Sequence, residues 1–282
     1  MVRDPVTGLM VDPAWADIQH PVEKPLRASD ATALRNPAPN VETEGRVNNY
    51  LLLTGANGGG ASTPDSDALH IVGDNTFIVC VACDDWTIAT DQYIIGKMTS
   101  PQRAYAMGVN NTDGQLFSKW STTGSDTVTD LSTVYPVCPD DTRIWLKTTL
   151  DVDDGSGNHV SRFYRAGFSY TVDPSDIIWT LVGAAVTTAG TTSIYAGTTA
   201  LEVGARGTGL QSFAGKIYRA QVLNSSGTVV ADFNPNDAAA GATTMVSSTT
   251  GETWTINGSS SLVAGTMVAG LEFAAGTYFG GG

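Results

Sequence analysis

The stretch RIWLKTTLDVDDGSGNHVSRFYRAG, residues 143–167, decides the fold class. Two runs rich in β-branched and aromatic residues flank the turn sequence DDGSGN at 153–158. Gly, Asn and Asp supply the positive φ values that a tight turn requires. The stretch therefore predicts an antiparallel β-hairpin.

Similar signals recur on both sides of this hairpin. NNTDG at 110–114 and NSSG at 224–227 each separate two strand-like runs, and Asn257-Gly258 predicts a further edge hairpin. Other short runs, such as FIVCVAC at 77–83, are also typical of strands. So many strands need two sheets packed face to face. We therefore predict an all-β, two-sheet antiparallel jelly-roll sandwich over residues 47–264.

From about residue 47 to 264 the strand order resembles the concanavalin A-like lectin/glucanase superfamily, and most closely the laminin-G-like domains of tailed-phage virion structural proteins. The stretches that carry this resemblance are WLKTTLDVDDGSGNHVSRFY at 145–164, IIWTLVGAAVTTAGTTSIYAGTTALEVGARG at 177–207 and FAGKIYRAQVLNSSGTVVADFNP at 213–235. The resemblance implies a jelly-roll fold. This fold hosts lectins, glycosidases and adhesion modules alike, so the resemblance leaves function open.

The composition changes sharply near residue 45. Six of the 12 prolines lie in the first 39 residues, where Gly8 is the only glycine. Proline at this density prevents regular helix and central strand. We expect residues 1–46 to form an extended assembly arm, with Trp15 as its main anchor, and residues 265–282 to form a tail that docks through Tyr278 and Phe279.

Charge and hydropathy exclude two classes of partner. The formal net charge is −13, and so acidic a surface repels phosphate backbones, which argues against nucleic-acid binding. No apolar run approaches the roughly 18 residues that a membrane helix needs, so we expect no membrane insertion. The N-terminal MVRDPVTGLMVDPAW has no apolar segment of the kind that a secretory signal requires, which favours synthesis in a host cytoplasm.

Residues for catalysis are not grouped in recognisable motifs. Glu202 is a lone acid, whereas glycosidases of this superfamily place paired carboxylates on one strand face. The chain has no G-x-S-x-G elbow and no phosphate-binding loop. Cys80 and Cys83 lie within a strand-like run without further metal ligands nearby, and we interpret them as buried small side chains. We therefore predict no enzymatic activity and no cofactor.

Two binding sites remain as candidates. Strand alternation places Arg143, Trp145 and Lys147 on one face, and Trp120 lies on another strand; exposed Trp beside cations would suit sugar stacking. The alternative is that Trp145 and Trp120 fill the core, as large aromatic residues commonly do. The candidate calcium ligands, which a plain turn explains as well, are Asp151, Asp153, Asp154 and Asn158.

Two functions fit these observations. The first is an exterior structural protein of a phage virion, on the tail or capsid, whose partners are other virion proteins, copies of itself and host-surface glycan. The Pro-rich arm favours this function, because it suits contact with neighbouring subunits. The alternative is a secreted or surface carbohydrate-binding module, which leaves the arm unexplained.

Overall fold

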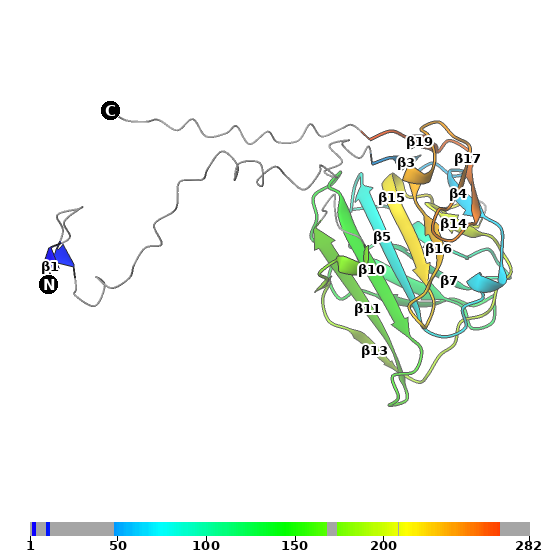
Figure 1. Cartoon of the computed structure of the whole chain (residues 1–282). Coiled ribbons are helices and arrows are strands. Elements are labelled where there is room, and N and C mark those ends of the chain that lie inside the picture. The colour runs from blue at the N-terminus through cyan, green and yellow to red at the C-terminus, as the bar shows by residue number, and fades with distance from the viewer. Residues whose placement is uncertain (1, 4–9, 12–47, 168–173, 208, 266–282) are drawn as a thin grey trace, which may run out of the picture. The chain divides into compact units, whose positions relative to one another are not determined.

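A computed structural model of the chain describes residues 2–3, 10–11, 48–167, 174–207 and 209–265. The chain divides into two units, Met1–Gly45 and Arg46–Gly282. In the first unit β1 (Val2–Arg3) pairs antiparallel with β2 (Met10–Val11). The second unit contains two large antiparallel sheets (Figure 1).

The nine-stranded sheet lies toward the viewer in Figure 1. Its strands run in the order β12-β11-β10-β5-β15-β3-β19, while β13 also pairs with β11 and β16 with β15. The bounds of these strands are β3 (Tyr50–Thr54), β5 (Asn75–Cys83), β10 (Ile144–Asp151), β11 (Asn158–Gly167), β12 (Thr180–Leu181), β13 (Val186–Ala189), β15 (Ala214–Leu223), β16 (Val229–Phe233) and β19 (Ser261–Val263).

The eight-stranded sheet packs behind the first, in the order β17-β18-β4-β14-β6-β7-β8-β9. Its strands are β4 (Gly60–Thr63), β6 (Gln92–Gly96), β7 (Tyr105–Val109), β8 (Leu116–Trp120), β9 (Val128–Leu131), β14 (Leu201–Val203), β17 (Thr244–Val246) and β18 (Thr253–Asn257). Every pair of neighbouring strands in both sheets is antiparallel. The predicted all-β, two-sheet jelly-roll sandwich is thus confirmed.

Helical structure within the described residues is limited to short 3-10 turns. These are η2 (Asp67–Leu69), η3 (Pro174–Asp176) and η4 (Pro235–Asp237). None of the helices in this part of the chain is long or apolar enough to cross a membrane.

The core lies between the two sheets and follows strand alternation. In β5, Phe77, Val79 and Val81 belong to the main apolar cluster. Their neighbours Ile78 and Cys80 belong to a separate cluster on the outer face of the nine-stranded sheet. Successive side chains of a strand point to opposite faces, so one strand supplies both clusters.

Three of the four predicted hairpins are confirmed. The turns at 110–114, 153–158 and 224–227 join β7 to β8, β10 to β11 and β15 to β16. The hairpin predicted at Asn257-Gly258 is wrong, because β18 pairs with β4 in one sheet and β19 pairs with β3 in the other. The turn there carries the chain from one sheet to the other.

The first and last strands of the sandwich, β3 and β19, are paired at the edge of the nine-stranded sheet. Tyr50 in β3 lies opposite Val263 in β19, in antiparallel register. Just beyond this pair, a Cβ added at Gly265 would lie 2.3 Å from the carbonyl oxygen of Asn48. The chain therefore enters and leaves the sandwich at the same point.

A buried ion pair fastens the loop before η2 to the eight-stranded sheet. The Lys97 side chain is fully buried, and its ammonium group donates to Asp65, which also accepts a hydrogen bond from His70 at 2.8 Å. Burial alone would raise the pKa of Asp65, but the bonds from Lys97 and His70 lower it below its ordinary value. Burial lowers the pKa of Lys97, although Asp65 opposes this effect.

Candidate functional site

The predicted sugar platform lies on the outer face of the nine-stranded sheet. As alternation predicts, Arg143, Trp145 and Lys147 belong to this face. The side chain of Trp145, however, is only 5% exposed and packs with Ile78 and Cys80. Its ring is therefore not a free stacking surface, which corrects the prediction of an exposed Trp145.

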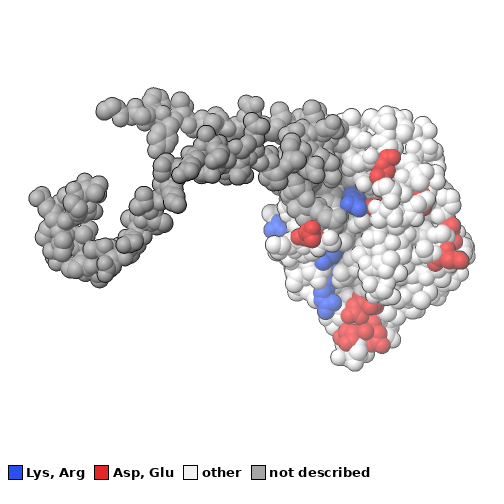
Figure 2. Space-filling view, viewed as in Figure 1, with Lys and Arg blue, Asp and Glu red and all other residues white. Residues whose placement is uncertain are grey.

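The basic side chains beside Trp145 lie over other aromatic rings on this face. The Arg143 guanidinium lies 3.6 Å from the ring centroid of Tyr218. The Lys147 ammonium lies 4.3 Å from the ring centroid of Tyr164 and 4.7 Å from that of Trp179. Such cation–π contacts hold the basic and aromatic side chains of the outer face to one another. Figure 2 shows basic side chains over β10 and β11, on this same face.

Trp120 belongs to the core and not to a binding surface. Its side chain is fully buried, and its indole Nε1 donates to Thr192 Oγ1 at 2.9 Å. The ring meets His159 edge-on at a centroid distance of 5.4 Å. A sugar cannot stack on a ring enclosed in this way, so the alternative interpretation of Trp120 as a core residue is correct.

The predicted calcium ligands form hydrogen bonds within the turn that contains them. Asp154 accepts hydrogen bonds from the backbone N–H groups of Ser156 and Asn158, and from the Asn158 side chain at 3.1 Å. Asp153 accepts from the backbone of Gly155, and Asp151 from that of Asp153. Figure 2 shows acidic side chains gathered at the end of the sandwich where this hairpin lies. Among the residues that the structure describes, no group of three acids, histidines or cysteines is arranged to hold a metal ion.

The paired cysteines are buried, as predicted. Cys83 faces the core, whereas Cys80 lies in the cluster on the outer face of the same sheet. Burial raises the pKa of Cys80 to about 11 and that of Cys83 to about 12. Since the two thiols lie on opposite faces of β5, they do not form a joint site. The predicted anchors Trp15, Tyr278 and Phe279 lie outside the described residues.

The sequence did not predict the pocket that the structure contains. It has a volume of about 690 Å³ and is formed by three connections between strands. Two of these connections cross between the sheets, β5 to β6 and β9 to β10, and the third is the hairpin from β7 to β8. The residues that line this loop pocket are Trp86, Thr87, Ile88, Asn111, Thr112, Asp113, Gln115, Thr133, Val134, Tyr135 and Cys138.

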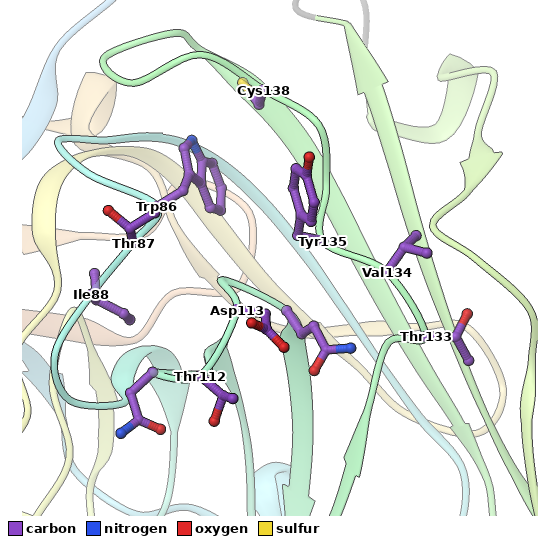
Figure 3. Close-up of a pocket in the computed structure, with 11 residues that line it drawn as sticks. Trp86, Thr87, Ile88, Thr112, Asp113, Thr133, Val134, Tyr135 and Cys138 are labelled. Carbon is purple, nitrogen blue, oxygen red and sulfur yellow. The ribbon is translucent and has the colours of Figure 1, made fainter.

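Two aromatic side chains stand opposite each other across the loop pocket (Figure 3). Trp86 is 7% exposed, and its backbone N–H donates to Asp140 Oδ1 at 3.2 Å. Tyr135 is 52% exposed. One fixed ring and one accessible ring therefore bound the same space.

The hairpin between β7 and β8 closes against Trp86 because of a glycine. Gly114 has a φ of +67°, and a Cβ at this position would lie 2.5 Å from the carbonyl oxygen of Trp86. Only glycine fits both the backbone conformation and this close approach. The polar residues Asn111, Thr112 and Asp113 of the same turn are thereby held at the pocket.

The loop from β9 to β10 is fixed by hydrogen bonds at its start and near its middle. Ser132 Oγ donates to the carbonyl oxygen of Val134 at 2.6 Å and accepts from the backbone of Leu116 at 3.0 Å. The Arg165 guanidinium donates to the carbonyl oxygen of Val137. These contacts present Val134 and Tyr135 at the surface, where both are about half exposed.

The two packed antiparallel sheets define a jelly-roll sandwich. No protein-family model matches the chain, and no curated protein sequence matches it.

Solved structures that are similar to part of this chain include a sialidase module, a pentraxin and a pair of laminin domains. A carbohydrate-binding module (CBM40) of the Ruminococcus gnavus IT-sialidase, bound to α2,3-sialyllactose, is 14% identical over 60% of this chain and 89% of its own, with a TM-score of 0.39. A heptameric SAP-like pentraxin from Limulus polyphemus is 15% identical over 64% and 76%, with a TM-score of 0.40. Domains LG4-5 of the mouse laminin α1 chain are 12% identical over 65% and 42%, with a TM-score of 0.41.

Proposed function

We propose that the sandwich is a non-catalytic carbohydrate-binding module and that the loop pocket is its binding site. The observation that carries this proposal is the half-exposed ring of Tyr135 at the pocket, beside amide, hydroxyl and carboxylate side chains, while Trp86, a buried core residue, forms the wall opposite. Aromatic rings stack on the apolar faces of sugars, while such polar groups bond to sugar hydroxyls.

The acids at the pocket support binding without turnover. Among the lining residues Asp113 is the one carboxylic acid, whereas glycoside hydrolysis ordinarily uses two carboxyl groups on either side of the bond to be cleaved. Glu202 lies on β14 and is not among the lining residues. We therefore expect a sugar to be bound and released unchanged.

Replacing Tyr135 by alanine is expected to weaken sugar binding by about tenfold or more, which corresponds to about 1.4 kcal/mol, because the exposed ring supplies one stacking face. Isothermal titration calorimetry with sugars chosen from a glycan array measures the change. Ile178→Ala is the matched control: Ile178 is 90% exposed and belongs to the segment between η3 and β12. Equal affinities of wild type and Tyr135→Ala would refute the loop pocket as the site.

We further propose that the chain is an exterior structural component of a phage virion, with other virion proteins and copies of itself as partners. The support is the abrupt change of composition near residue 45, together with the division of the chain after Gly45. A Pro-rich segment without its own core gains order by lying on another surface. In this setting the sandwich would contact glycans on the host surface.

Deleting residues 1–40 is expected to leave the melting transition of the sandwich unchanged, because the sheets of the second unit begin at Tyr50. The same deletion is expected to abolish incorporation into particles and to turn an oligomer into a monomer. Calorimetry, light scattering and particle assembly with the truncated gene measure these effects. Normal incorporation of the truncated protein, or an arm that touches only its own sandwich, would contradict the proposal.

A further inference from the structure

The loop pocket is bounded by negative charge. None of its lining residues is Lys or Arg. The side chain of Asp113 is exposed at the pocket (Figure 3). This carboxylate is therefore available to a bound molecule.

Two more carboxylates flank the Trp86 side of the pocket. Asp140 accepts the backbone N–H of Trp86, and Asp85 accepts the backbone N–H of Thr87 at 2.6 Å. Both aspartates are exposed. Hydrogen bonds from the hydroxyl and the backbone of Thr87 lower the pKa of Asp85, so this group stays ionised near neutral pH.

The basic side chain that is bonded to the β9–β10 loop already has a hydrogen-bond partner. The Arg165 guanidinium donates to the carbonyl oxygen of Val137, and neither residue lines the pocket. An anionic group entering the pocket would thus meet Asp113 and, near it, Asp85 and Asp140, without a lining cation to compensate. Repulsion between like charges at such a site discriminates against a ligand even where its shape fits.

We infer that the loop pocket binds uncharged sugars and excludes sugars that carry a carboxylate or a sulfate. This inference rests on the proposed function, since it names the class of ligand for the same site. Neutral hydroxyl and acetamido groups can donate to Asp113, and they can donate to or accept from Asn111 and Gln115. Carboxylate and sulfate groups offer no donor to Asp113 and are repelled by it.

The test uses matched pairs of sugars that differ only by the anionic group: methyl glucoside with methyl glucuronide, lactose with 3′-sulfolactose, and N-acetylglucosamine with its 6-sulfate. Calorimetry at low salt is expected to give an affinity at least about tenfold weaker for the anionic member. Asp113→Asn is expected to reduce this difference in affinity by about twofold to fivefold, the size of one exposed charge interaction. Asp153→Asn, an exposed aspartate at the opposite end of β10, should leave the difference unchanged.

Each outcome decides one claim. Weaker binding of the anionic sugar in each pair supports the inference if the difference in affinity narrows in Asp113→Asn and in 0.5 M salt. Anionic sugars that bind as well as their neutral partners, and lose affinity in Tyr135→Ala, overturn the inference and leave the proposed function standing. The absence of binding by any sugar in the panel and on the array overturns the proposed function, and the inference with it.

Discussion

Trp120→Ala is expected to lower the free energy of unfolding by about 3–5 kcal/mol, the range for deleting a large aromatic side chain from a core. The ring is fully enclosed between the sheets and packs edge-on against His159. The deletion also removes the hydrogen bond from Nε1 to Thr192. Because the surrounding sheets are fixed by their own hydrogen bonds, the site cannot collapse to fill the space.

Chemical denaturation followed by circular dichroism measures this loss. Tyr135→Ala serves as the control, because half of its side chain is exposed and surface changes ordinarily stay within about 0.5 kcal/mol. Trp120→Phe should fall between the two, since it keeps an aromatic ring but loses the bond to Thr192. A loss below about 1 kcal/mol for Trp120→Ala would show that this ring is not a core residue.

Asp65→Ala is expected to destabilise the protein by about 3–5 kcal/mol, because it leaves the buried ammonium group of Lys97 without its partner. Lys97→Met should cost less, since Asp65 is partly exposed and keeps its bond to His70. The double variant should recover much of the loss, because it leaves no buried charge. This account would be contradicted if the two single variants lost the same stability and the double variant lost the sum of the two.

The pH dependence of these variants follows from the pKa shifts. Asp65 has a lowered pKa in the folded state, so its contribution is present above the ordinary aspartate pKa and is lost as pH falls below about 4. Lys97→Met should weaken that acid sensitivity. In Asp65→Ala the charged form of Lys97 is the disfavoured one, so the destabilisation should shrink as pH rises toward about 10.

The sequence predicted the sandwich because its hairpins carry local signals. Turn residues at 110–114, 153–158 and 224–227 specify antiparallel pairs without reference to the rest of the chain. The strand β4, with the sequence GAST, was not predicted, because small residues lack the β-branched pattern. Its place between β14 and β18 depends on partners about 140 and 195 positions away, which are non-local contacts.

The binding site was harder to predict for a related reason. Alternation correctly grouped Arg143, Trp145 and Lys147 on one face, but it gave no sign that neighbouring side chains bury Trp145. The loop pocket draws residues from three connections, and only the folded sandwich brings these together. The available signal was aromatic residues outside the strand-like runs: Trp86 follows two aspartates, and Tyr135 directly precedes a proline.

The adjacent entry and exit of the sandwich determine how it responds to mechanical tension. A pull on Asn48 and Gly265 acts on the antiparallel pair β3–β19 from one end, where Tyr50 faces Val263. The backbone hydrogen bonds of that pair are then loaded one after another, as in a zipper, and not all at once in shear. The sandwich therefore yields first at this edge, while β5 and β10, which lie farther inside the sheet, pair with neither of the two loaded strands.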